Sequence, residues 1–309
     1  MDDWMMNYDC AVKGENISKK FKTFTLDIPD LRVPKGFATA LIGENGAGKT
    51  TLLNMLSGIR LDYKGELTFF DKYSSEEKER RADVKNRIGY TGTGRYYLPQ
   101  WTVSDVEEIS SLLFDNFDRD EFERYCRELA IFPDSPDGVA LKKKCSALSD
   151  GTRTKLMLAG VMARDTDLLL LDEPASPLDP LMRDKLCQMI GDYISDGAGE
   201  KSVLFSTHNI SDMESITDYA IIMEHGNVVE CGFVEDLKEK YILIKGDAQD
   251  TEAASKILYT MTKNPYGFEG ICLAENLDKL AGMNVSKEIP SLFQISVAVM
   301  KNNTKMVLK

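Results

Sequence analysis

The sequence predicts an α/β fold in which helices flank a mostly parallel sheet. Four short apolar runs, at residues 37–42, 168–171, 202–206 and 220–223, have the length of buried strands. Stretches with the apolar spacing of helices alternate with these runs, and that alternation favours a parallel sheet. A glycine-rich turn follows the first run and leads into a helix-compatible stretch at residues 51–58, which supports the same fold class.

The remaining elements can be assigned in chain order. The run around residues 67–70 predicts another strand, and the charged segment 74–85 predicts an exposed helix. From about residue 102 to residue 163, apolar residues recur at helical spacing. Residues 224–227, which read EHGN, predict a hairpin turn between two short strands.

The chain changes character after about residue 240. Residues 241–245 predict a strand, residues 252–261 a helix, and residues 291–300 a further element. None of these segments carries a motif with recognisable chemistry. We therefore expect residues 241–309 to form a small α+β accessory domain.

The composition excludes several classes of protein. The chain has 309 residues, a formal net charge of −12 and a pI of about 4.8, so we expect no nucleic-acid partner. Six dispersed cysteines without a C-x-x-C pair, with only two histidines, predict neither a disulfide framework nor a zinc site. No apolar run approaches the ~18 residues of a membrane span, and no secretory signal is visible. These features fit a cytoplasmic protein.

Residues 43–51 read GENGAGKTT and fit the pattern G-x-x-x-x-G-K-[ST]. The motif lies between a predicted strand and a predicted helix, which is the context that phosphate binding requires. Its glycines let backbone N–H groups turn toward phosphate oxygens, and the helix presents its positive end to them. We expect Lys49 to reach the β- and γ-phosphates of ATP and the Thr50 hydroxyl to bind Mg²⁺. The residues expected to contact nucleotide are Gly43, Glu44, Asn45, Gly46, Ala47, Gly48, Lys49, Thr50 and Thr51.

The apolar run 168–171 ends in two acids, Asp172 and Glu173. Ligands bind at the carboxyl ends of parallel strands, so these carboxylates are expected beside the phosphates. Asp172 would hold Mg²⁺, directly or through a water. Glu173 would accept a proton from, or orient, the water that attacks the γ-phosphate. A strand that ends in acidic residues is common, but together with the phosphate loop it indicates a nucleotide-hydrolysing site.

A third motif, LSDGT at residues 148–152, lies about a hundred residues after the phosphate loop and just before the acidic strand. In this register the chain resembles the ATP-binding cassette family, whose signature reads LSGGQ. The resemblance covers residues 8–237. It implies a phosphate-loop NTPase fold with an N-terminal antiparallel β subdomain and a helical subdomain inserted at about residues 92–165. It also implies that Ser149 and Gly151 contact the γ-phosphate held by a second subunit.

Further residues match the family. Asp179 lies in the loop after the acidic strand and would connect the two active sites of a dimer. His208 follows the run 202–206 and, as the family's switch histidine does, would contact the γ-phosphate and position the attacking water together with Glu173. Phe21 lies where the family stacks an aromatic ring on adenine. Phe24 is the alternative, and both rings could instead belong to the core.

Two positions depart from the family pattern. Thr93 occupies the register of a glutamine that senses Mg²⁺ and couples to the permease; its hydroxyl can still bind Mg²⁺ or a water, but with a shorter reach. Asp150 replaces a glycine or another neutral or basic residue of the signature. A carboxylate ~5 Å from a γ-phosphate would cost roughly 3 kcal/mol at an effective dielectric of about 20. We therefore expect the Asp150 side chain to point away from the nucleotide.

These residues predict a Mg²⁺-dependent ATPase that closes around ATP as a homodimer or heterodimer. The chain looks most like single-cassette subunits of exporters, which implies a separate integral-membrane permease and a place on the cytoplasmic face of the membrane. The aromatic segment 96–101 is either the permease contact or part of the interior of the helical subdomain. Two alternatives remain: a cassette ATPase without a permease, and a regulatory cassette with little turnover.

Overall fold

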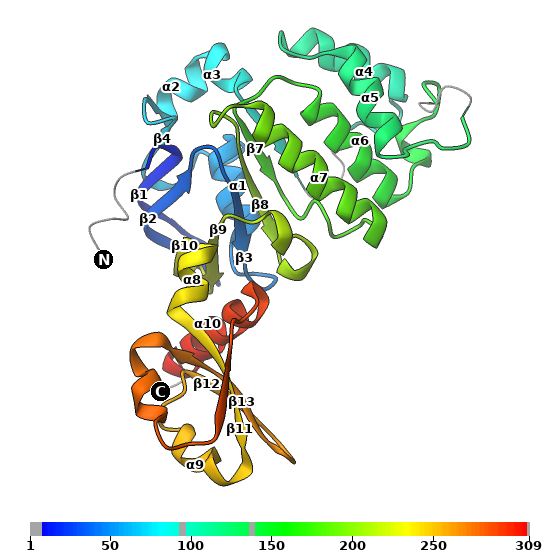
Figure 1. Ribbon diagram of the computed structural model, residues 1–309. Helices are drawn as coiled ribbons and strands as arrows, with labels where there is room; N and C mark the ends of the chain where they lie inside the picture. Colours follow the sequence, from blue (N-terminus) through cyan, green and yellow to red (C-terminus); the bar gives the residue numbers. More distant parts are fainter. Residues whose placement is uncertain (1–7, 93–96, 136–139, 308–309) are drawn as a thin grey trace.

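The computed structural model describes residues 8–92, 97–135 and 140–307. Figure 1 shows a large upper part with two sheets and a smaller lower part with a third sheet. The last helix of the chain, α10 (Leu292–Val307), lies where the two parts meet. Within the described ranges, no helix is both long enough and apolar enough to cross a membrane.

A six-stranded sheet forms the centre of the larger part, with the strand order β10-β9-β3-β8-β7-β6. All neighbouring strands in it are parallel except β10, which forms an antiparallel hairpin with β9. The four apolar runs are four of its strands, so the predicted α/β fold is confirmed. The strands are β3 (Ala38–Ile42), β6 (Ile88–Thr91), β7 (Leu168–Leu171), β8 (Ser202–Thr207), β9 (Tyr219–Glu224) and β10 (Asn227–Phe233).

Both faces of the central sheet are covered. Leu168 and Leu170 of β7 pack into one core with leucines of α1 (Lys49–Ser57). Leu169 and Leu171 point to the opposite face and pack into a second core with residues of α7 (Pro180–Asp196). Side chains alternate between the two faces of a strand, so a wholly apolar strand needs a cover on each side.

A separate antiparallel sheet packs on the α1 side, with the order β2-β1-β4-β5. Ile17 and Ile28 of this sheet share a core with Leu52 and Leu53 of α1. The antiparallel sheet therefore holds α1 in place. Because the phosphate loop leads directly into α1, the sheet also positions that loop. Its strands are β1 (Cys10–Lys20), β2 (Thr25–Pro34), β4 (Lys64–Phe69) and β5 (Tyr73–Ser74).

The single exposed helix predicted at residues 74–85 is wrong in two respects. The segment forms two short helices, α2 (Ser75–Arg80) and α3 (Ala82–Asn86). Lys78 is also buried, and its Nζ donates a hydrogen bond to the carbonyl of Leu56 at 2.9 Å. Burial lowers the pKa of this ammonium, which satisfies a carbonyl at the C-terminal end of α1.

In the described part of the region between β6 and β7 lie three α-helices, α4 (Val103–Leu113), α5 (Arg119–Glu128) and α6 (Asp150–Met162). Each begins at a side chain that accepts a hydrogen bond from the backbone N–H three residues later, as helix caps do. The caps are Thr102, Asp118 and Ser149. The signature turn therefore positions the start of α6.

The smaller part has an antiparallel sheet with the order β12-β13-β11-β14 and a core of its own around Ile244, Phe268 and Cys272. The helix predicted at residues 252–261 ends early, because Thr260 and Thr262 belong to a strand that pairs with β13 and β-branched residues favour strands. The elements are α8 (Val234–Lys240), β11 (Tyr241–Asp247), α9 (Thr251–Ala254), β12 (Thr260–Asn264), β13 (Gly267–Leu273) and β14 (Val285–Glu288).

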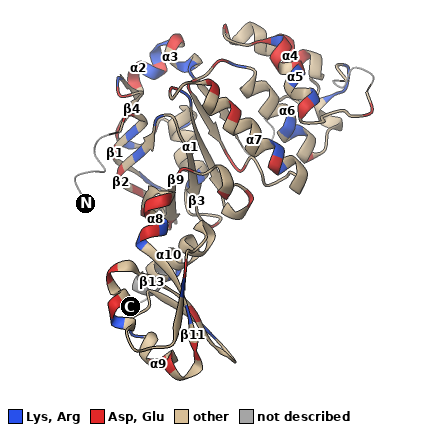
Figure 2. Cartoon of the chain, viewed as in Figure 1, with Lys and Arg blue, Asp and Glu red and all other residues tan. Residues whose placement is uncertain are grey.

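Charged side chains of both signs are mixed on the outer helices. Figure 2 shows Lys and Arg interleaved with Asp and Glu on α2, α5 and α8. Ion pairs such as Arg80–Glu76 and Arg124–Glu121 hold many of these groups. All six cysteines are free thiols, and five of them are buried.

Candidate active site

The phosphate loop connects β3 to α1 and is pressed against neighbouring backbone. Gly46 and Gly48 have positive φ angles of 90° and 108°, which side chains rarely allow. A Cβ atom at Gly48 would lie 2.8 Å from Leu26 Cδ1, and one at Gly43 would lie 2.5 Å from the carbonyl oxygen of Met223. The loop thus needs glycine at these positions for two reasons, conformation and close packing.

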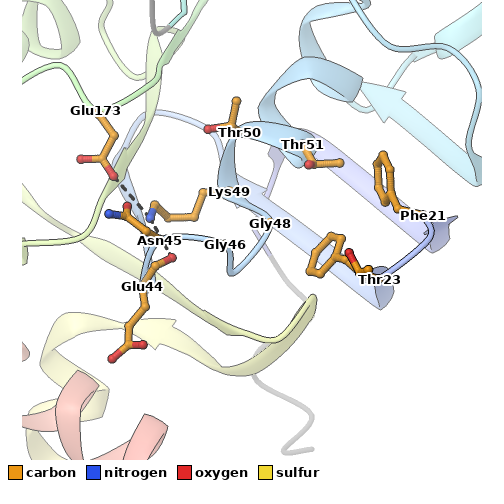
Figure 3. Close-up of a pocket in the computed structure, with 11 residues that line it drawn as sticks. Phe21, Thr23, Glu44, Asn45, Gly46, Gly48, Lys49, Thr50, Thr51 and Glu173 are labelled. Carbon is orange, nitrogen blue, oxygen red and sulfur yellow. Dashed lines mark hydrogen bonds and ion pairs between the residues drawn. The ribbon is translucent and has the colours of Figure 1, made fainter.

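A cavity of about 520 Å³ opens over this loop (Figure 3). It contains seven of the nine loop residues predicted to contact nucleotide, whereas Gly43 and Ala47 lie behind its surface. The two candidate adenine-stacking residues, Phe21 and Phe24, and the predicted base Glu173 also line the cavity. The lining residues are Phe21, Thr23, Phe24, Glu44, Asn45, Gly46, Gly48, Lys49, Thr50, Thr51 and Glu173.

Lys49 is buried at the first position of α1, with its ammonium aimed into the loop. Its Nζ donates hydrogen bonds to the carbonyl oxygens of Gly43 at 2.6 Å and Glu44 at 3.3 Å. The same Nζ lies 3.3 Å from Glu173 Oε1, as the dashed lines in Figure 3 mark. The predicted phosphate-binding cation and the predicted base therefore form an ion pair across the cavity.

Glu173 has two further features of a functional residue. Its Oε2 lies 2.8 Å from Nδ1 of His208, so the two residues predicted to position the attacking water lie together. Its φ angle is +51°, a conformation that is uncommon outside glycine and asparagine and that proteins retain mainly at functional sites. The Glu173 backbone N–H donates to Ser206 Oγ at 2.9 Å, which helps to hold this conformation.

Asp172 lies behind Glu173 and is 4% exposed. Its Oδ1 accepts a hydrogen bond from Ser206 Oγ at 2.6 Å, while its Oδ2 has no partner among the described residues. A buried carboxylate oxygen without a partner is costly, and a Mg²⁺ ion or its bound water would satisfy it. The exposed Thr50 hydroxyl adds a second oxygen donor on the phosphate-loop side. The residues present therefore fit a magnesium ion.

Ser206 is the functional residue that sequence reasoning missed. It is fully buried at the end of β8, and its one hydroxyl group donates to Asp172 and accepts from the Glu173 backbone. Its signal in the sequence is weak: a serine directly after the apolar residues Val203–Phe205, in a strand with two other polar residues. The adjacency arises from the parallel register, in which Leu171 lies opposite Phe205.

The signature turn lies at the rim of a second cavity of about 480 Å³, which also contains Asp172, Glu173 and His208. Asp150 lies in this lining, and its Oδ1 pairs with Arg153 Nη1 at 2.8 Å. The charge of Asp150 is therefore neutralised by Arg153, an ion pair that the sequence analysis did not predict.

Ser149, Gly151 and Asp179, the residues predicted to act at the dimer interface, are not among the described residues that line the cavity over the phosphate loop. Ser149 caps α6 and accepts a hydrogen bond from the Thr152 N–H. Asp179 caps α7 and accepts one from the Met182 N–H. A Cβ at Gly151 would lie 2.9 Å from the carbonyl oxygen of Pro177, so the signature turn packs against the loop that contains Asp179.

The two candidate adenine-stacking residues differ in their surroundings. Phe24 packs on the glycines of the site, because its ring lies 2.9 Å from a Cβ built at Gly48. Phe21 lies farther out, with the Arg60 guanidinium 5.2 Å from its ring centroid and the Lys19 ammonium at 5.8 Å. Both rings are half-buried and line the cavity, but Phe21 lies beside two cations, whereas Phe24 packs against the phosphate loop.

The aromatic segment that follows β6 can be followed only in part, because Thr93 and Tyr96 lie outside the described residues. Tyr97 and Trp101 pack against the core of the helical region. A Cβ at Gly160 would lie 2.4 Å from the Tyr97 hydroxyl, so this side chain sits directly on α6. For these two rings the interior interpretation holds.

Comparisons with known proteins fit this geometry. Residues 26–176 match the family model described as ABC transporter. The energy-coupling factor transporter ATP-binding protein EcfA2 of Lactobacillus gasseri is 25% identical over 253 residues, covering 80% of this chain and 85% of its own. An uncharacterized ABC transporter ATP-binding protein of Nostoc sp. is 28% identical over 267 residues, covering 85% of this chain and 77% of its own.

Two solved structures share the fold. The ATP-binding subunit of an ABC transporter has a TM-score of 0.62 at 21% identity, with 74% of this chain and 92% of that chain covered. A dimeric bacterial ABC transporter cassette has a TM-score of 0.61 at 19% identity, with 72% and 98% covered. With the family model matched over residues 26–176 and the ion-paired lysine, acid and histidine beside its phosphate loop, the chain is a phosphate-loop ATPase with the ABC cassette fold, similar to the ATP-binding subunits of ABC transporters.

Proposed function

We propose that two copies of this cassette, or this cassette and a related one, close around ATP and drive a separate membrane permease. Residues 8–237 form the catalytic cassette in this proposal, and residues 241–309 form an accessory domain. The observation that carries it is the convergence of Lys49, Glu173 and His208 at the carboxyl ends of parallel strands. The names of the relatives, which are transporter ATP-binding proteins, support the permease.

Each residue of the site has a distinct role in hydrolysis. The phosphate loop and Lys49 bind the β- and γ-phosphates through backbone N–H groups and the ammonium. Thr50 and Asp172 hold Mg²⁺, which neutralises phosphate charge when bound. Glu173 orients the attacking water and accepts its proton, and His208 fixes that carboxylate through its Nδ1 contact of 2.8 Å.

The second cassette supplies the rest of the site. Ser149 and Gly151 do not line the cavity over their own phosphate loop, which supports a role for them at the nucleotide of a partner. Closure from mostly open to mostly closed requires about 5.5 kcal/mol of differential binding. Several charge-assisted contacts to phosphate, at about 1.5–3 kcal/mol each, can supply it. Loss of the γ-phosphate removes them and reopens the pair.

The exporter subclass expected from the sequence is left out of this proposal. The relatives reported above do not support it, because the first of them is an energy-coupling factor transporter ATP-binding protein.

The Glu173→Gln variant tests the proposal. We expect its rate of phosphate release from Mg·ATP to fall about 10²–10⁴-fold, because the amide cannot accept the proton of water. We also expect ATP, but not ADP, to hold the variant as a dimer in sedimentation experiments. Glu66→Gln, an exposed acid on β4, is the matched control and should keep wild-type activity. Negligible turnover in the wild type, equal to that of Glu173→Gln, would instead support a regulatory cassette.

A further inference from the structure

A third cavity, a cleft of about 700 Å³, lies between the phosphate loop and the C-terminal part of the chain. The turn between β9 and β10 and the Glu44 side chain form one wall. Strands β11, β12 and β13 and helix α10 form the others. Residues that line the cleft include Glu44, Leu243, Glu269, Ile271, Phe293 and Ala298.

The cleft has an apolar floor and an acidic rim. Leu243, Ile271 and Ala298 are buried at its base, and Phe293 stands at its edge with 45% of its surface exposed. Such a mixture of apolar area with a few polar groups, at this volume, is typical of small-molecule sites. Phe293 is a large apolar side chain that a ligand in the cleft would cover.

The charges of the rim are unbalanced. Among the described residues, the acids Glu44, Glu224 and Glu269 line the cleft together with Lys301 and His225, and the buried Glu224 carboxylate already accepts a hydrogen bond from Asn303. The Glu44 carboxylate has no hydrogen-bond or ion-pair partner in the described part of the chain. Within the described ranges, the Glu269 carboxylate forms a long ion pair of 4.0 Å with Lys245, whose ammonium also pairs with Glu288 at 2.6 Å. This excess of negative charge selects a cation and disfavours an anion.

The cleft shares a lining residue with the cavity over the phosphate loop, and its walls contact that loop. Glu44 lines both cavities, and Figure 3 shows its side chain directed away from Lys49, toward the red C-terminal ribbon. The Gly226 N–H in the β9–β10 turn donates to the carbonyl of Ala47 at 3.0 Å. Asn303 of α10 donates to the Glu224 carboxylate at 2.6 Å. A ligand in the cleft would therefore touch the outer side of the phosphate loop.

We propose that this cleft binds a small organic cation with an apolar body, an amine or a quaternary ammonium compound, and that its occupancy regulates ATP binding. The apolar body lies on Leu243, Ile271 and Phe293, and the cationic group lies beside the Glu44 and Glu269 carboxylates. Neutralising Glu44 reduces its repulsion of incoming polyphosphate, so occupancy raises ATP affinity. The binding site stands by itself, whereas its regulatory effect rests on the function proposed above. Because coupling is reciprocal, ATP must raise affinity for the cation equally.

Calorimetry with octylamine as the probe tests the site in the full chain without nucleotide. We expect octylamine to bind at least tenfold more tightly than octanol or octanoate, which share its apolar body. Glu269→Lys should weaken octylamine binding at least tenfold, and Phe293→Ala should weaken it about three- to tenfold. The matched control is Glu275→Lys, an exposed acid outside the cleft lining, which should bind as the wild type does. Equal binding of the three probes, no binding, or unchanged binding by Glu269→Lys would overturn the site.

Titration of a fluorescent ATP analogue, with and without saturating octylamine, tests the regulation. We expect ATP affinity to rise about two- to fivefold in the wild type, as for one partly exposed charge pair, and to stay constant in Glu269→Lys. An unchanged affinity in the wild type would overturn the regulatory effect. Loss of ATP binding in every protein, with octylamine still bound, would count against the function proposed for the cassette and leave the cleft site intact.

Discussion

Removing the Ser206 hydroxyl is the sharpest test of how this site is held together. That one group donates to Asp172 Oδ1 at 2.6 Å and accepts from the Glu173 N–H at 2.9 Å. Both oxygens of Asp172 would lack a protein partner in Ser206→Ala, because Oδ2 already has none among the described residues. The substitution also releases the backbone of Glu173 from its left-handed conformation.

The structure sets the size of the effect. A hydrogen bond to a charged group contributes about 1.5–3 kcal/mol, and one between neutral groups contributes about 0.5–1.5 kcal/mol. Their sum predicts that the free energy of unfolding falls by roughly 2–4 kcal/mol. A displacement of the base by ~1 Å lowers rates about 10²-fold, so we expect turnover to fall by one to two orders of magnitude.

Strand β8 supplies a matched control at its other end. Ser202 is also fully buried, and its hydroxyl accepts a hydrogen bond from the Gly36 N–H at 2.9 Å. Ser202→Ala should lose about 1–3 kcal/mol of stability and keep wild-type turnover, because no catalytic residue depends on it. Urea unfolding and phosphate release measure both variants. Wild-type kcat and Mg²⁺ dependence in Ser206→Ala would refute the positioning role.

Three further predictions concern other parts of the cassette. Asp150→Gly should change the affinity of ATP-driven dimerisation by less than about tenfold, because the carboxylate is exposed and paired; a hundredfold gain in sedimentation experiments would show that it faces phosphate. Phe21→Ala should weaken binding of a fluorescent ATP analogue by about 1–3 kcal/mol with little loss of stability, whereas Phe24→Ala should lower the melting temperature as well; equal melting temperatures would contradict this assignment. Burial acts to raise the pKa of Asp71, but its bonds to Lys13 and a backbone N–H lower it below the ordinary value. That stabilisation is present above the unfolded pKa of 3.8 and is lost as pH falls through the folded pKa, so Asp71→Asn should lose less unfolding free energy than the wild type on acidification, measured with urea.

The chemistry of the loop and the acids could be predicted because it is local in sequence. A strand, a glycine-rich turn and a lysine within a dozen residues define where phosphates lie, whatever surrounds them. Ser206 could not be found in this way, because its neighbours Asp172 and Glu173 are more than thirty residues away. Their contact depends on β8 lying beside β7 in a parallel register.

The cleft at the accessory part was also beyond sequence reasoning. Glu44 reads as a variable position of the phosphate loop, and nothing near it in sequence indicates a second cavity. Glu269 and Phe293 lie more than two hundred residues away, in segments without a motif. Only the packing of α10 against β9 and β10 brings them to the outer side of the loop.

The ion pair between Lys49 and Glu173 implies an order for the catalytic steps. The Lys49 ammonium is 6% exposed, and a buried charge without a counter-ion is strongly destabilising. Glu173 supplies that counter-ion at 3.3 Å, together with two backbone carbonyls. A polyphosphate that binds Lys49 replaces Glu173 in this role, and the carboxylate keeps only its contact with His208. In the proposed mechanism, Glu173 therefore becomes free to accept a proton from water only after phosphate has bound Lys49, so substrate binding releases the base.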